Sequence, residues 1–201
     1  MGSEHGSKPD DPQVGGTDAA ERQRVIDAAT AIFTGYGPAS VTLKWIALAS
    51  GIPVERLSTE WPTVDALLAS VLDNVASAVE AVGWADFRLA PEELAERGRL
   101  IEIYERVVAR SLLDGVNPAQ LETAFPQTDR LVATYQSALG LDERTARYRV
   151  YQGCALEWGW RLFGPHLLIA CGLDGEPEGR PYDELQKLHE QLIRLPPVTP
   201  L

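Results

Sequence analysis

Positive charge is scarce in this sequence. Its 201 residues include 18 Lys and Arg against 29 Asp and Glu, which leaves a formal net charge of −11. Such a surplus of acidic residues keeps a chain soluble and disfavours polyanions over its surface as a whole. Any contact with a nucleic acid must therefore come from a local arrangement of residues.

Cysteine and long apolar runs are also scarce. The two cysteines, Cys154 and Cys171, do not form a disulfide framework and indicate a reducing cytoplasm. No run of about 18 apolar residues occurs, so we expect no membrane span. The N-terminus has no basic segment followed by an apolar one, so we expect no secretory signal. The expected location is cytoplasmic.

Residue patterns typical of catalysis or metal binding are absent. His5, His166 and His189 lack metal-ligand spacing, and the two cysteines lie too far apart to form a CxxC unit. No glycine-rich loop suited to holding phosphate appears. We therefore expect neither an enzyme nor a metal or cofactor site.

The stretch from Thr42 to Trp61 is the most informative part of the chain. It predicts two short helices around a tight turn. Gly51 ends the first helix, because glycine adopts the left-handed backbone without steric cost. Pro53 fits the first turn of the second helix, where its missing N–H does no harm. Leu57 and Trp61, four residues apart, face the same core, and the whole is a helix-turn-helix pattern.

Helical periodicity extends over the rest of the chain. A hydrophobic content of 45% suffices for one well-buried core. Gly164 and Pro165 predict a break or a kink in the helix, with a buried continuation over 166–171. Residues 1–17, which lack apolar periodicity, predict a disordered arm. The predicted helices cover about 18–36, 42–50, 53–60, 63–83, 91–114, 117–124, 126–139, 142–163 and 182–195.

Residues 22–75 resemble the TetR family of bacterial transcriptional regulators. The residues that carry the resemblance around the helix-turn-helix are Arg24, Ile26, Ala28, Ala29, Phe33, Gly37, Thr42, Leu67 and Leu68. The resemblance implies an all-α fold with an N-terminal three-helix DNA-binding headpiece over 18–78. A C-terminal helical bundle for ligand binding and dimerisation would follow over 79–201. The implied function is that of a ligand-responsive transcriptional repressor.

The headpiece residues divide by their expected contacts with DNA. In a helix-turn-helix the second helix of the pair enters the major groove, and its early residues meet base edges. Arg56 is the strongest candidate there, since a guanidinium binds guanine through two hydrogen bonds. Thr42 and Lys44 are placed to hold phosphates. The full set expected at the DNA is Thr42, Lys44, Trp45, Pro53, Val54, Glu55, Arg56, Ser58, Thr59 and Trp61, the last as an anchor beneath the helix.

The resemblance also implies a small-molecule pocket in the C-terminal bundle and a two-fold homodimer. An apolar lining would suit a small hydrophobic ligand, whose identity the sequence leaves open. Aromatic residues at helical spacing are also typical of a core, and Glu157 is either a buried polar hook or a solvated acid. The homodimer would form through helices near 142–163 and 182–195 and would match a palindromic operator in double-stranded DNA. The candidate lining residues are Trp84, Phe87, Tyr104, Tyr135, Tyr151, Glu157, Trp158 and His166.

The headpiece departs from the family pattern, which keeps a second interpretation open. Val54 and Glu55 stand where relatives commonly have a small residue and a glycine, and Ser58 replaces a usual tyrosine. From residue 18 to 61 there are four basic residues against five acidic ones. Arg22 and Arg24 either touch phosphate or pair with nearby acids. The alternative is a TetR-like fold with a degenerate headpiece that acts as a protein-interaction or ligand-sequestering module.

Overall fold

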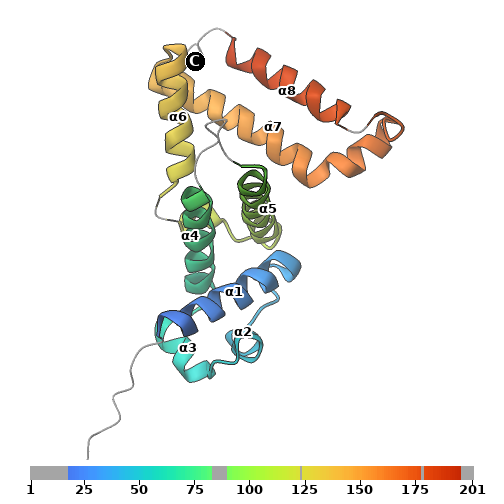
Figure 1. Cartoon of the computed structure of the whole chain (residues 1–201). Helices are drawn as coiled ribbons and strands as arrows, with labels where there is room; N and C mark the ends of the chain where they lie inside the picture. The colour runs from blue at the N-terminus through green and yellow to red at the C-terminus, as the bar shows by residue number, and fades with distance from the viewer. Residues whose placement is uncertain (1–17, 83–89, 123, 178, 196–201) are drawn as a thin grey trace, which may run out of the picture.

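The helix-turn-helix lies at one end of the molecule, and the later helices extend away from it (Figure 1). The structure is a computed structural model, and it describes residues 18–82, 90–122, 124–177 and 179–195. Within these ranges the chain is all-α. The predicted arm over 1–17 and the candidate residues Trp84 and Phe87 lie outside them. The elements are α1 (Ala19–Tyr36), α2 (Leu43–Ser50), α3 (Val54–Glu60), α4 (Val64–Val82), α5 (Pro91–Leu113), the 3₁₀ turn η1 (Pro118–Gln120), α6 (Pro126–Leu139), α7 (Glu143–Ala170) and α8 (Arg180–Ile193).

Local signals begin and end the first helices as the sequence predicts. The Asp18 carboxylate accepts a hydrogen bond from the Glu21 N–H at 2.7 Å and caps α1. The Thr42 hydroxyl caps α2 by accepting from the Trp45 N–H at 3.3 Å. Gly51, with φ +70°, ends α2 in the left-handed conformation. These caps set where α1 and α2 begin and where α2 ends.

One core joins the headpiece to the helices that follow it. The apolar stripe of α1 packs against α2, α4 and α5. Val107 and Val108 of α5 are buried in the same cluster as Phe33, Leu57 and Leu68. The predicted domain boundary between residues 78 and 79 therefore does not coincide with a break in the packing.

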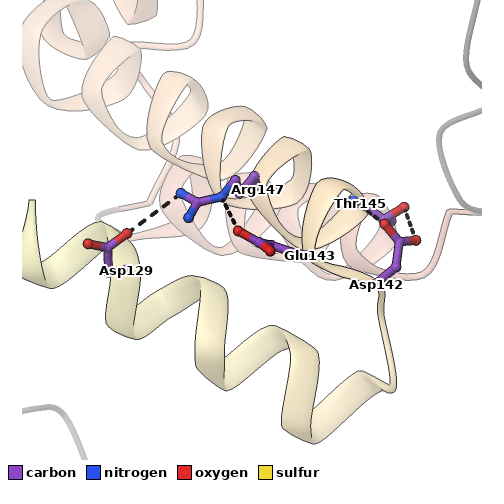
Figure 2. Close-up of polar contacts among 5 residues, drawn as sticks. All are labelled: Asp129, Asp142, Glu143, Thr145 and Arg147. Carbon is purple, nitrogen blue, oxygen red and sulfur yellow. Dashed lines mark hydrogen bonds and ion pairs between the residues drawn. The ribbon is translucent and has the colours of Figure 1, made fainter.

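A second, smaller core lies where α6 meets α7. Val132, Ala146 and Val150 form it. Figure 2 shows the polar contacts at this corner. The Asp142 carboxylate caps α7 by accepting from the Thr145 N–H at 3.0 Å and from its hydroxyl at 2.7 Å. These hydrogen bonds hold the pKa of Asp142 below its usual value.

Arg147 ties α6 to the start of α7 in the same view (Figure 2). Its guanidinium lies 3.6 Å from the Asp129 carboxylate of α6, and its Nε donates to Glu143 at 3.0 Å. Both pairs are exposed, so each contributes less than about 1 kcal/mol to the free energy of unfolding. The contacts orient the corner more than they stabilise it.

Three predicted boundaries are wrong. The helix expected to reach about Phe163, and to break or kink at Gly164 and Pro165, continues through Pro165 to Ala170, and the continuation expected to be buried is mostly exposed. A proline inside a helix removes one hydrogen bond and bends the axis, and α7 does change direction in its second half (Figure 1). The helix expected over 117–124 is only η1, and α8 begins at Arg180 rather than near Tyr182.

Within the described ranges, no helix is long and apolar enough to cross a membrane.

Candidate nucleic-acid interface and ligand cavity

The exposed face of α3 carries the short polar side chains that the sequence places at the DNA. Glu55, Ser58 and Thr59 are exposed, whereas Val54 and Arg56 are half-buried. Thr42, Lys44 and Trp45 are exposed at the start of α2, and Pro53 is exposed just before α3. The structure therefore brings these candidates together on adjoining turns of α2 and α3.

Two buried residues hold α3 from beneath. Leu57 is fully buried, and Trp61 lies in the core and donates its indole N–H to the Ser70 hydroxyl at 2.9 Å. This hydrogen bond satisfies the one polar atom of a buried indole and fixes α3 to α4. Because Trp61 is buried, it can act on a nucleic acid only by positioning α3.

Two ion pairs join α3 to α1 across the headpiece. The Arg56 guanidinium pairs with the Glu21 carboxylate, with Nη2–Oε2 at 2.5 Å and Nη1–Oε1 at 3.2 Å. Arg22 pairs with Glu60 and lies over the Trp61 ring at 5.1 Å from its centroid. Two of the four basic side chains of the headpiece are thus already neutralised within the chain. Arg56, the strongest predicted contact, is one of them.

A cavity of about 300 Å³ lies between α4, α5, α6 and α7. Most of its wall is apolar, with the Tyr104 and Trp158 rings in an edge-to-face contact at 6.3 Å between centroids. The Tyr104 hydroxyl donates to the Glu122 carboxylate at 2.7 Å. The lining residues are Ala76, Val79, Ile101, Tyr104, Glu105, Val108, Leu112, Asn117, Pro118, Ala119, Glu122, Ala124, Phe125, Pro126, Gln127, Thr128, Leu131, Cys154 and Trp158.

Glu105 is a buried acidic residue in the mostly apolar wall of this cavity. Its residue surface is only 2% exposed. Burial raises the pKa of Glu105 to about 7; Arg161 opposes the rise, while the Glu157 and Glu102 carboxylates add to it. Its Oε1 lies 3.6 Å from the Arg161 guanidinium, whereas its buried Oε2 has no hydrogen-bond partner among the residues that the structure describes. Burial also raises the pKa of Glu122, which lines the same cavity.

The remaining ligand-binding candidates do not share this cavity. Tyr135 and Glu157 line a neighbouring cavity of about 120 Å³, which Glu105 and Trp158 also border. The Tyr135 hydroxyl lies 3.2 Å from the His189 ring. Tyr151 and His166 are exposed and line neither cavity.

Sequence reasoning missed Glu105 and Glu122. For Glu105 a signal was available: it lies four residues after Ile101 and three before Val108, so an acid falls on the apolar stripe of its helix. Glu122 offered no comparable signal, because it follows the short turn η1 rather than lying on a periodic helix. The described residues contain no group of His, Cys, Asp and Glu arranged to hold a metal ion.

Comparisons with known proteins bear on the whole chain. No family model matches it. An HTH-type transcriptional repressor of Mycobacterium tuberculosis strain H37Rv is 34% identical over 154 residues, which cover 75% of this chain and 77% of the relative. An HTH-type transcriptional regulator of Mycobacterium bovis matches to the same extent. This chain belongs to the HTH-type transcriptional regulators. The solved structure of the multidrug binding protein EbrR complexed with imidazole is 20% identical, with a TM-score of 0.48, over 90% of this chain and 93% of that one.

In this HTH-type regulator, α5 links the cavity to the headpiece. Tyr104 and Glu105 near its middle line the cavity, and Asp114 directly follows its C-terminus. The Asp114 carboxylate accepts a hydrogen bond from the Ala39 N–H at 2.9 Å, in the loop between α1 and α2. Gly37, with φ +74°, lets that loop approach: a Cβ there would lie 2.5 Å from the Asp114 Oδ2. A shift of α5 would therefore reach the regulator's headpiece directly.

The regulator also exposes large apolar side chains at the end opposite the headpiece. α7 and α8 lie there side by side (Figure 1). Not one residue of α8 is fully buried in the single chain, although the helix is strongly amphipathic. The exposed apolar residues on and just after these two helices are Tyr148, Tyr151, Phe163, Leu167, Ile169, Leu173, Tyr182, Leu188 and Leu195.

Proposed function

We propose that this regulator is of TetR type and acts as a ligand-responsive repressor that binds a palindromic operator as a homodimer. The observation that carries the proposal is the exposed polar face of α3, held from beneath by Leu57 and Trp61. Such a helix fits the major groove, with Ser58, Thr59 and Arg56 toward base edges and Thr42 and Lys44 toward phosphates. The repressor named among the relatives supports the sign of regulation.

Dimerisation is supported by the apolar surface of α7 and α8. A helix that keeps an apolar face in solvent commonly buries it against another chain. Two copies related by a two-fold axis would bury this face against itself. They would hold their α3 helices about 34–36 Å apart, or a multiple of that distance, to match two half-sites.

Ligand response is supported by the path from the cavity to the headpiece. A ligand between α4, α5 and α7 would bias the position of α5, and the Asp114–Ala39 hydrogen bond would pass that bias to the loop before α2. A hundredfold fall in operator affinity requires a difference of about 2.7 kcal/mol between the two states, which is within the usual range of allosteric coupling.

The deciding experiment measures fluorescence polarisation of labelled DNA fragments from the region around the regulator's own gene. Fragments of random sequence and equal length serve as competitors at low and moderate salt. We expect one fragment to bind better than random DNA, and Lys44→Gln and Arg56→Gln to weaken that binding. Arg106→Gln, on the exposed face of α5, is the matched control for loss of one positive charge. If no fragment outcompetes random DNA even at low salt, the repressor proposal is wrong.

The ion pairs of the headpiece favour a second candidate function. With Arg22 and Arg56 paired to Glu60 and Glu21, little free positive charge faces a phosphate backbone. The headpiece would then be degenerate, and the protein would act as a protein-interaction or ligand-sequestering module. Co-purification of a protein partner that survives high salt, together with absence of DNA binding, would favour this candidate over the first.

A further inference from the structure

Glu105 of α5 borders the largely apolar cavity of about 300 Å³ and also the neighbouring cavity of about 120 Å³ that Arg161 lines. The side chain projects from the middle of α5, is 2% exposed, and has only one oxygen near a cation, Arg161 Nε at 3.6 Å. The other oxygen is buried and has no hydrogen-bond partner in the described part of the chain. A buried unpaired acceptor is costly, and a ligand that supplies the missing partner recovers that cost.

Charge around the cavity is unbalanced toward the negative. Glu105 and Glu122 both line it, whereas the described lining residues include no Lys, Arg or His. Arg161 lies behind Glu105 and is shared with Glu157, whose Oε2 is 3.9 Å from the same Nε. One guanidinium thus serves two carboxylates, and among the described residues the side chain of Glu122 is hydrogen-bonded to the Tyr104 hydroxyl. An anionic ligand would meet repulsion here, and a cation would meet attraction.

Aromatic faces complete the site. Tyr104 and Trp158 line the same cavity with their rings at 6.3 Å between centroids, and Phe125 borders it. Aromatic rings attract cations that approach their faces, and the attraction is strongest where water is excluded. The volume of about 300 Å³ leaves room for an apolar body as well as a charged group.

We infer that this cavity binds an organic cation with an aromatic or aliphatic body, its charged group between the Glu105 carboxylate and the Tyr104 and Trp158 rings. The inference deepens the proposed function and depends on it for its regulatory meaning. Binding itself can be tested without DNA.

The test is isothermal titration calorimetry of the full chain with two probes that differ only in charge. These are para-(trimethylammonio)benzyl alcohol and its uncharged isostere para-tert-butylbenzyl alcohol. Titrations at a pH of about 8 keep Glu105 mostly ionised. We expect the cation to bind the wild-type chain at least about tenfold more tightly than the isostere, which corresponds to about 1.4 kcal/mol.

Matched variants assign the effect to Glu105. Glu105→Gln keeps the shape and removes the charge, and it should reduce the affinity for the cation by about tenfold or more. Glu96→Gln makes the same change at an exposed side chain nine residues earlier on α5 and should leave the affinity unchanged. Thermal unfolding checks that each variant is folded. If Glu105→Gln does not fold, the comparison of the two probes on the wild-type chain still tests whether the protein prefers the cation.

The outcomes separate this inference from the proposed function. Equal or tighter binding of the uncharged isostere, saturable binding of neither probe, or full affinity in folded Glu105→Gln overturns the inference, even if the protein binds an operator. Cation binding without any operator binding upholds the inference and overturns the repressor proposal. Cation binding that weakens operator binding supports both.

Discussion

Release of Arg56 from its ion pair should strengthen binding to DNA. Glu21→Gln keeps the size of the side chain at the end of α1 near α3, but removes the charge that holds Arg56. The freed guanidinium can then reach a phosphate or a base edge from α3. Glu21→Gln also removes a negative charge from residues 18–61, which hold five acidic residues against four basic ones, so both effects act in the same direction.

The size of the expected gain in DNA affinity follows from the solvent exposure of the Arg56–Glu21 ion pair. The Arg56 and Glu21 side chains are 39% and 19% exposed, so their attraction is partly screened and is worth at most about 1 kcal/mol. In the wild-type protein, the ion pair must break before Arg56 can contact DNA, so the energy of the pair is subtracted from the binding energy. Its removal should raise affinity about threefold to fivefold at low salt. One added phosphate contact should also steepen the dependence of log K on log salt by about 0.9.

The assay is fluorescence polarisation on a random DNA duplex across a salt series, which needs no knowledge of the operator. Glu55→Gln is the matched control, because it removes one exposed negative charge from α3 without releasing an arginine. We expect a smaller gain and an unchanged salt slope for Glu55→Gln. The double variant Glu21→Gln with Arg56→Gln should lose the gain. Weaker binding by Glu21→Gln would refute the reasoning and show that Glu21 instead holds Arg56 in its DNA-binding orientation.

Three further outcomes are expected. Burial raises the pKa of Glu105 to about 7 from 4.5, so between these values the folded state keeps a proton that the unfolded chain has lost. The free energy of unfolding should therefore fall by roughly 1–3 kcal/mol as pH rises through that window, and urea unfolding of Glu105→Gln should show a flatter profile. Leu188→Glu, at a residue 46% exposed on α8, should convert the proposed dimer to a monomer in sedimentation, with the helical content unchanged; a persisting dimer would place the interface elsewhere. Gly37→Ala should lower the unfolding free energy by roughly 1–3 kcal/mol, because φ is +74° and the added Cβ would meet Asp114; an unchanged melting temperature would contradict this.

Local signals explain why the headpiece could be predicted from sequence. The caps at Asp18 and Thr42, the left-handed Gly51 and the apolar spacing of Leu57 and Trp61 act over a few residues each, and the structure confirms the helices that they predict. The exposed positions on α3 follow from the same period. Nothing local, however, indicates that Arg56 meets Glu21, because that pair depends on how α1 crosses α3.

The cavity was only partly predictable for the same reason. Tyr104 and Trp158 line it, whereas Tyr151 and His166 are exposed on a helix that continues through Pro165. The sequence shows where aromatic residues occur but not which of them line the same cavity, because that depends on how four separate helices pack. Glu105 could have been found as an acid on an apolar stripe.

The close fit of Gly37 against Asp114 limits how this protein could be recombined with its relatives. Val107 and Val108 of α5 belong to the same core as the helix-turn-helix, so α5 and the headpiece are packed as one unit. A chimaera that joins this headpiece to another sensor should work only if the donor also supplies a matching end of α5. Engineers of hybrid biosensors should therefore graft the loop at 37–39 together with the residues around 107–114, rather than cut the chain near residue 78.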